Sequence, residues 1–183
     1  MERSSGILLP ISALPSPYGI GTLGKAAYDF VDFLAEAEQK WWQILPVGPT
    51  SYGDSPYQSF STFAGNPYFV DLEILCEEGV LEQAEIDAPD WGSDPVKVDY
   101  EKIYNSRFLL LEKAKQRGWG KDAEEIKRFT EENKSWLPDY ALYMALKRHF
   151  CPGLCSCKAT EKDRNVGLTA ALQLLLIALL FVF

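Results

Sequence analysis

Two short apolar runs that flank one amphipathic segment constrain the fold of this chain more than any other feature. The runs Gly6–Pro10 and Trp41–Pro46 each end at a proline, as short buried strands do. Between them, apolar residues recur every three or four positions and predict a helix capped by Thr22; they are Leu23, Ala27, Phe30, Val31, Leu34 and Ala37. Strand, helix and strand with short connections form a βαβ unit with parallel strands and a right-handed crossover.

Helices dominate the pattern of the remaining sequence. Residues 47–66 are rich in Gly, Pro, Ser and Tyr and predict a long loop at the carboxyl end of the second strand, where α/β folds carry their chemistry. After it we predict, in order, a short strand, a short helix, a connector and three longer helices: 68–72, 72–79, 86–98, 99–117, 121–133 and 136–150.

The composition is that of a globular protein and disfavours nucleic acid as a partner. Of the 183 residues, 47% are apolar, which is enough to bury a core. The 18 Lys and Arg against 26 Asp and Glu give a formal net charge of -8, so no basic face for phosphate is expected. The first residues lack the apolar stretch of a signal peptide, and we therefore expect a cytoplasmic location.

The sequence changes character near residue 150, and we predict a boundary between residues 1–150 and an unrelated tail, 151–183. The tail holds three of the four cysteines, and its residues 166–183 carry no charge. Two interpretations stay open. The tail is either a membrane anchor with Lys158, Lys162 and Arg164 on its cytoplasmic side, or the product of a shifted reading frame, which we favour. A membrane is a partner only if the tail is genuine.

Four residues with zinc-binding side chains lie close together around the predicted boundary: His149, Cys151, Cys155 and Cys157. Zinc sites favour ligand pairs two to four residues apart on two separate turns, and this spacing does not provide them. We therefore expect no metal site, and we expect no cofactor.

The segment from Tyr52 to Tyr68 is where we expect contact with a ligand. Aromatic rings alternate there with hydroxyl and amide groups. That mixture suits a sugar, because the apolar C–H face of a sugar packs on rings while its hydroxyls need fixed donors and acceptors. The alternative is structural: Gly-Asp-Ser-Pro and Asn-Pro are common turn sequences, and the rings then only hold the loop in place.

Several blocks in a fixed order resemble the 4-alpha-glucanotransferase family, also called amylomaltases or disproportionating enzymes. The resemblance covers about residues 3–150. Its main blocks are Ser5–Pro10, Ser12–Ser16 with Tyr18–Gly21 and Gly24, Trp42–Thr50, Gly53–Gln58 and Ala64–Pro67, with weaker support from Val98–Tyr100 and Trp136–Leu142. Several long blocks in the right order are far more specific than a single short motif.

The resemblance implies an α/β fold and an enzyme of α-glucan metabolism. The fold would be the amino-terminal part of a (β/α)₈ barrel, its first two strands, with part of an inserted helical subdomain. The activity would move a segment of an α-1,4-glucan to a new 4-position of a glucan or glucose acceptor, by a retaining double displacement that uses two carboxylates. Maltooligosaccharides and other α-1,4-glucans would be its partners.

The resemblance also implies that no catalytic residue lies in this chain. A complete barrel needs roughly 250 residues, and the family's catalytic carboxylates come later in its sequence. Asp54, Asp71 and Asp99 have no partner acid nearby in the sequence, and we expect none of them to be a catalyst. We therefore expect the fragment alone to be inactive; the alternative is a non-catalytic, membrane-tethered remnant that binds glucan.

Four residues are predicted to contact substrate through this resemblance. Ser55 and Tyr57 match family positions that face the bound glucan beside the catalytic centre. Tyr52 and Tyr100 match tyrosines placed for a second, more distant glucan contact. Packing within the loops is the alternative for each of them.

The predicted βαβ piece is an incomplete fold. The far edge of its second strand would be unpaired, and the side chains of Trp42 and Ile44 would be uncovered, whereas parallel strands need cover on both faces. We therefore expect the fragment to aggregate or to be degraded when it is alone.

Overall fold

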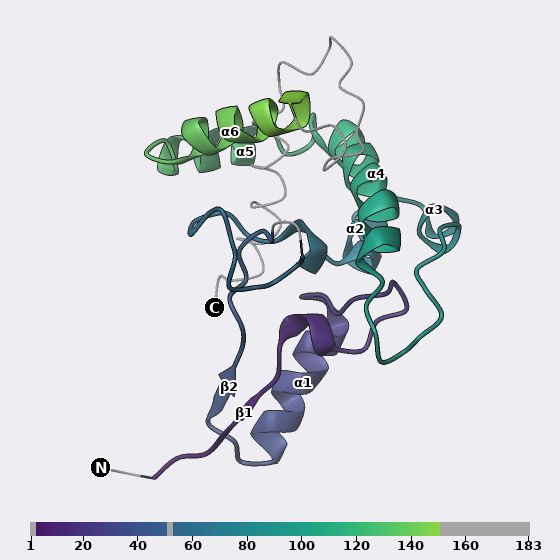
Figure 1. Cartoon of the computed structure of the whole chain (residues 1–183), viewed down its shortest axis with the longest axis vertical. Helices are drawn as coiled ribbons and strands as arrows, with labels where there is room; N and C mark the ends of the chain where they lie inside the picture. The colour runs from purple at the N-terminus through teal and green to yellow at the C-terminus, as the bar shows by residue number, and fades with distance from the viewer. Residues whose placement is uncertain (1–2, 51–52, 151–183) are drawn as a thin grey trace. The chain divides into compact units, whose positions relative to one another are not determined.

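The computed structural model describes residues 3–50 and 53–150, and the chain divides into two compact units. Unit 1 consists of residues 1–47 and 66–110, and unit 2 of residues 48–65 and 111–183. Unit 1 holds both strands and the first three α-helices, unit 2 holds the last two, and the fourth α-helix begins in unit 1 and ends in unit 2 (Figure 1). The boundary predicted at residue 150 lies at the end of the described residues and stays a prediction.

The predicted βαβ unit is present in unit 1. Strands β1 (Gly6–Leu8) and β2 (Trp41–Gln43) are parallel, and their register pairs Gly6 with Trp41. Helix α1 (Lys25–Glu36) connects them and lies beside both strands (Figure 1). Both strands are shorter than the apolar runs that predicted them.

The helix cap predicted at Thr22 is wrong. Helix α1 begins at Lys25, after Gly24, and no side chain caps it. The Thr22 hydroxyl is buried and donates a hydrogen bond to the carboxylate of Asp71 instead. Gly24 lies so close to the same carboxylate that an added Cβ would be 2.0 Å from Asp71 Oδ2, which explains a glycine at this position.

The short strand predicted at 68–72 is also wrong. The chain forms a 3₁₀ turn there, η2 (Pro67–Phe69), because Pro67 favours a helical start and Asn66 caps the turn by accepting from the Tyr68 backbone N–H at 3.0 Å. Helix α2 (Leu72–Glu77) follows as predicted. Asp71 caps it by accepting from the N–H groups of Glu73 and Ile74 at 2.9 and 3.1 Å.

The remaining elements follow the predicted order, with two additions. A 3₁₀ turn, η1 (Ile11–Ala13), lies in the proline-rich loop, and α3 (Gln83–Asp87) lies before the connector. The three longer helices are confirmed as α4 (Tyr100–Gly118), α5 (Ala123–Glu132) and α6 (Leu137–Phe150). Helix α3 was missed because one short turn of helix has too few residues to show a period.

Each unit has its own buried side chains. In unit 1, side chains from α2, α3 and α4 are almost completely buried, among them Leu72, Leu75, Ile86 and Ile103. In unit 2, Ala64, Ile126, Phe129 and Leu137 form a cluster, against which Trp119, Trp136 and Tyr140 pack. Ala64 thus ties the loop segment of unit 2 to helices α5 and α6.

The expectation that Trp42 and Ile44 would be uncovered needs correction. Both are half-buried. The Trp42 ring meets Phe30 of α1 edge-on with 5.0 Å between centroids, and its indole N–H donates to the Leu9 carbonyl at 2.8 Å. The exposed large apolar residues of the sheet are Leu8 and Trp41 instead, beside the exposed Gly6 and Gln43. The predicted strands were right, but the side of the sheet that α1 covers was assigned wrongly.

Within the described ranges, no helix combines the length and the apolar character needed to cross a bilayer. The tail 151–183 lies outside those ranges. It includes the residues predicted as an anchor or a frame shift and the three cysteines of the ligand cluster. Both interpretations of the tail therefore stay predictions.

Candidate functional site

A tight turn presents two of the four predicted substrate residues together. The backbone N–H of Gln58 donates to the Ser55 carbonyl at 3.1 Å, and Pro56 holds the second position of this turn. Tyr57 follows at the third position with 73% of its surface exposed, while Ser55 is half-buried. Among the described residues, Tyr57 makes no ring contact and no side-chain hydrogen bond. We call residues 55–58 the Ser55 turn.

The residues before the Ser55 turn hold an uncommon backbone conformation. Gly53 and Asp54 have φ values of 96° and 53°, in the left-handed region that glycine and, among other residues, aspartate tolerate best. The Thr50 hydroxyl donates to Asp54 Oδ1 at 3.2 Å. Partial burial raises the pKa of the Asp54 carboxyl, and the Thr50 hydrogen bond opposes this rise. Asp54 therefore has a structural reason to be at this position.

Two phenylalanines after the turn hold the segment against α6 and the residue before it. The Phe60 ring stacks on Tyr140, with 6.4 Å between centroids, and Lys147 Nζ lies 4.1 Å from the Phe60 centroid. Phe63 stacks on Trp136 at 5.5 Å. Burial raises the pKa of the Tyr140 phenol to about 12. These rings anchor the base of the segment, whereas Tyr57 projects from its tip.

Serine hydroxyls fix the backbone between the two phenylalanines. The Ser59 hydroxyl donates to the Ser61 carbonyl at 2.7 Å, and the Ser61 hydroxyl accepts from the Ala64 N–H at 3.0 Å. Gly48 approaches this segment so closely that an added Cβ would be 2.4 Å from Ser59 Oγ. The segment is thus held by its own hydrogen bonds as well as by α6.

The other two predicted substrate residues are not part of this turn. Tyr52 lies outside the described residues. Tyr100 is half-buried at the start of α4 in unit 1, where its ring centroid is 6.0 Å from that of Tyr68. The structure therefore brings Ser55 and Tyr57 together and describes Tyr100 as part of a different unit.

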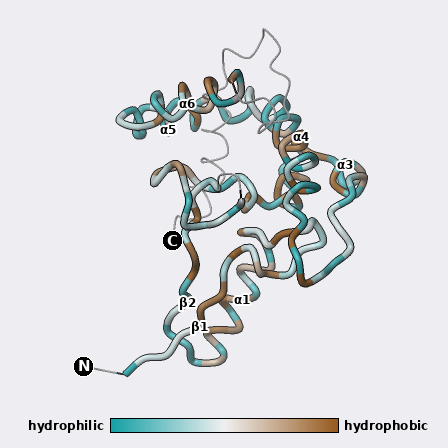
Figure 2. The backbone as a smooth tube through the Cα atoms, in the orientation of Figure 1, coloured by the Kyte–Doolittle hydropathy of each residue, from teal (hydrophilic) through white to brown (hydrophobic). Residues whose placement is uncertain are grey.

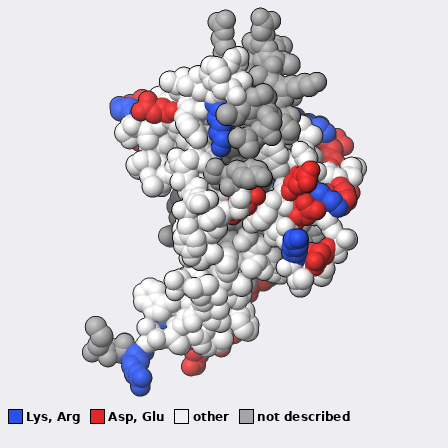
Figure 3. Space-filling model, viewed as in Figure 1, with Lys and Arg blue, Asp and Glu red and all other residues white. Residues whose placement is uncertain are grey.

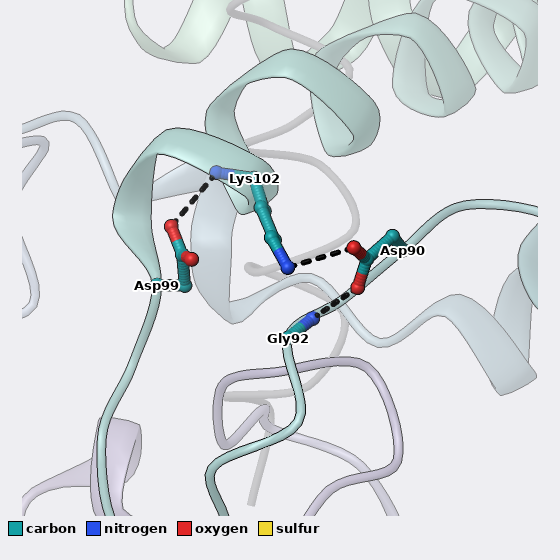
Figure 4. A network of polar contacts seen from close by, with 4 residues as sticks. All are labelled: Asp90, Gly92, Asp99 and Lys102. Carbon is teal, nitrogen blue, oxygen red and sulfur yellow. Dashed lines mark hydrogen bonds and ion pairs between the residues drawn. The ribbon is translucent and has the colours of Figure 1, made fainter.

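The aspartates that were not expected to be catalysts stabilise the starts of helices. Asp71 caps α2 and accepts from Thr22, and Asp99 Oδ1 accepts from the Lys102 N–H at 3.2 Å as α4 begins. Figure 4 shows this network: Lys102 Nζ also lies 2.7 Å from Asp90 Oδ2, and Asp90 accepts from the Gly92 N–H. These backbone and ion-pair contacts give each of the carboxylates a structural role.

The sequence pattern does not separate the rings that stack on other aromatic residues from the ring that does not. Phe60, Phe63 and Tyr57 all belong to one aromatic-rich segment, and composition alone treats them alike. A signal was present elsewhere, because Trp136, Tyr140 and Tyr143 recur at helical spacing and form an aromatic stripe that begins one residue before α6 and continues along it. Such a stripe indicates that aromatic residues from another segment pack on it.

Comparison with known proteins shows one consistent family. The family model described as 4-alpha-glucanotransferase matches residues 9–165. The 4-alpha-glucanotransferase of Streptococcus pneumoniae is 55% identical over 150 residues, which is 81% of this chain and 30% of the relative. That of Thermus thermophilus is 46% identical over 151 residues, 80% of this chain and 29% of the relative.

A solved structure gives the same result. The amylomaltase from Streptococcus agalactiae in complex with acarbose has a TM-score of 0.87 and 35% identity, and the match covers 98% of this chain and 39% of that one. This chain spans about 30% of the length of the curated relatives it matches. From the family match and these identities, the chain belongs to the 4-alpha-glucanotransferase family.

Proposed function

We propose that this chain supplies the amino-terminal part of a cytoplasmic 4-alpha-glucanotransferase. The complete enzyme would transfer a segment of an α-1,4-glucan to a new 4-position on a glucan or glucose, with retention of configuration through a covalent intermediate. Family membership, and a similar amylomaltase solved with acarbose, support this proposal.

The fold supports the same assignment. A parallel pair of strands joined by a helix is the repeating piece of a (β/α)₈ barrel, and β1, α1 and β2 form such a piece. We assign β1 and β2 to the first two barrel strands. Helices α5 and α6 of unit 2 would belong to the inserted helical region.

The observation that carries the proposal is the exposed Tyr57 beside Ser55 on an anchored segment. An exposed tyrosine ring offers an apolar face for the C–H face of a glucose unit and a hydroxyl for its oxygens. Because Phe60 and Phe63 already hold the segment on α6, the Tyr57 ring is not needed to pin it. Ser55 adds a second hydroxyl at the start of the same turn.

Tyr52 and Tyr100 complete the proposed set of glucan contacts. The resemblance assigns them to a second, more distant contact. Tyr100 is half-buried at the amino end of α4, so the residue is not fully enclosed.

The proposal gives this chain a role in binding rather than in bond cleavage. Retaining transfer needs two carboxylates about 5–5.5 Å apart, whereas Asp54, Asp71 and Asp99 hold turns and helix starts. The nucleophile and the acid/base would come from the part of the enzyme that this chain does not match. The chain alone is then inactive.

A chimeric enzyme tests the proposal. The matched segment of this chain replaces the corresponding segment of the Streptococcus pneumoniae relative, and conversion of maltotriose to shorter and longer maltooligosaccharides is measured. We expect the transfer rate of the chimera to lie within about tenfold of the parent's rate. This corresponds to a loss of no more than about 1.4 kcal/mol of transition-state stabilisation. A chimera that unfolds cooperatively yet does not transfer would contradict the proposal.

A further inference from the structure

We propose that Arg107 is a positioning residue for the second glucan contact: it fixes the turn η2, and the Tyr68 ring of that turn fixes the orientation of Tyr100. The inference rests on the proposed function, because it takes Tyr100 as a glucan contact. The residues that carry the inference, 66–71 and 100–108, all belong to unit 1.

Arg107 is completely buried, which is rare for an arginine. It lies in the first half of α4 with an exposed fraction of 0%, and it is the largest fully buried side chain among the described residues. On the face shown in Figure 3, charged side chains gather at the surface over the region of α3 and the start of α4, as charged side chains normally do. An arginine in the interior needs a reason other than packing, because burial of its charge costs free energy.

The charge of Arg107 is only partly compensated. Burial lowers the pKa of its guanidinium to about 10, and the Asp71 carboxylate opposes this fall. Among the described residues, the Nε and Nη1 atoms of Arg107 have no hydrogen-bond partner. With a pKa near 10 the guanidinium is charged at neutral pH, so the hydrogen bond made by its Nη2 atom is a charge-assisted one.

That hydrogen bond holds the end of η2. Arg107 Nη2 donates to the carbonyl of Val70, the residue that ends the 3₁₀ turn. The Leu23 N–H donates to the Phe69 carbonyl at 3.0 Å, and Asn66 caps the start of the turn. The turn η2 is thus fixed at both ends, and Arg107 supplies its polar contact with α4.

Tyr68 is the link between η2 and Tyr100. Only 7% of Tyr68 is exposed, and its ring centroid lies 6.0 Å from that of Tyr100 and 5.8 Å from that of Phe108. Tyr100 and Phe108 are about two turns apart on α4, so Tyr68 packs beside the stretch of helix that contains Arg107. A shift of η2 would move the Tyr68 ring and remove the support of the Tyr100 ring.

Apolar residues already provide the burial that α4 needs. Ile103 and Leu110 of this helix are 0% and 4% exposed, and Figure 2 shows hydrophobic and hydrophilic residues alternating along it. Apolar burial stabilises a helix without fixing a direction, whereas a guanidinium adds a directed bond to one carbonyl. The contribution of Arg107 is therefore the orientation of η2 rather than the burial of α4.

A double-mutant cycle in the chimera tests the inference. The variants are Arg107→Met, Tyr100→Ala and both together, and transfer from maltotriose and from amylose is measured. The second contact is distant from the catalytic centre, so only a long glucan reaches it. We expect Arg107→Met to raise the KM for amylose about two- to tenfold, the range for one lost aromatic contact, and to leave the KM for maltotriose unchanged.

The double variant separates positioning from plain stability. Adding Arg107→Met to Tyr100→Ala should not raise the KM for amylose further, because the ring through which Arg107 acts is then absent. A loss of stability alone would reduce the folded fraction, which lowers the kcat measured with both glucans and changes neither KM. The matched control is Arg128→Met on α5, where the arginine side chain is 63% exposed; both KM values should stay unchanged.

A second variant covers the case in which Arg107→Met prevents folding, which the melting temperature and circular dichroism would show. Tyr68→Leu removes the ring beside Tyr100 and leaves the guanidinium in place. It should raise the KM for amylose in the same range and leave the KM for maltotriose unchanged.

Three results would overturn the inference. The first is an unchanged KM for amylose in a folded Arg107→Met or Tyr68→Leu chimera while Tyr100→Ala raises it; the proposed function would then stand. The second is an equal rise for maltotriose and amylose, or the same rise with and without Tyr100→Ala. The third is a Tyr100→Ala chimera with the parent's KM for amylose, which removes the second contact itself, whereas maltotriose transfer by the chimera still tests the proposed function separately.

Discussion

Aromatic residues close together in one segment have different roles in this chain. Phe60 stacks on Tyr140 of α6 and Phe63 on Trp136 just before it, whereas the exposed Tyr57 at the tip of a turn stacks on no ring among the described residues. The sequence could predict that rings and hydroxyls gather here, but not which ring is free. That distinction depends on α6, more than seventy residues later in the chain, and a local pattern does not report such a contact.

Tyr140 gives a prediction about pH. Its folded-state pKa is raised from 10.0 to about 12 by burial, so the phenol is deprotonated in the unfolded chain at a lower pH than in the folded one. Its contribution to stability is complete below pH 10 and is lost as pH rises from 10 to 12.

In the chimera, we expect the ionisation of Tyr140 to lower the free energy of unfolding by on the order of 2–3 kcal/mol between pH 10 and 12. Urea unfolding at several pH values measures this, and Tyr140→Phe should remove that part of the loss. An identical alkaline loss in wild type and Tyr140→Phe would show that the phenol does not titrate in this way.

At the scale of elements, the βαβ unit was predictable because periodicity and proline positions are local properties. The misassigned cap has a long-range cause, whereas the misassigned strand has a local one. Thr22 bonds Asp71, 49 residues away, and this contact takes the hydroxyl from the helix start. The apolar residues after Asn66 resemble a strand, but the Asn66 cap and Pro67 favour a 3₁₀ turn over a strand.

The anchoring of the loop segment on α6 predicts the effect of Phe63→Ala. Phe63 is 66% exposed, so it stabilises the folded segment through its stacking on Trp136 rather than through deep burial. We expect the chimera to lose about 0.5–1.5 kcal/mol, measured as a lower midpoint of urea unfolding. Phe60→Ala should cost more because Phe60 also contacts Tyr143 and Lys147. Equal midpoints for wild type and both variants would contradict this anchoring.

At the scale of the whole molecule, the chain is an open piece of a larger α/β fold. Both strand edges and the Leu8 and Trp41 face lack cover within the described residues. The sequence predicted the open edge correctly but placed the uncovered face at Trp42, because the covered side of a short strand depends on where the helix returns.

We therefore predict that residues 1–150 on their own aggregate or unfold without cooperativity. Exposed strand edges pair with other chains, and apolar faces add to this tendency. Size-exclusion chromatography and thermal unfolding measure it. A monomeric elution volume together with one cooperative transition would show that the piece is stable without further strands.

The central claim is that the Ser55 turn positions a glucan, and Tyr57→Ala in the chimera tests it most directly. Losing one hydrogen bond costs about 0.5–1.5 kcal/mol, and losing a stacked ring with its hydroxyl costs more. Tyr57→Ala should therefore reduce kcat/KM for maltotriose transfer more than Ser55→Ala does. The melting temperature should not change, because Tyr57 is exposed. Wild-type kinetics in the Tyr57→Ala chimera, or a loss of activity fully explained by a lower melting temperature, would contradict the account.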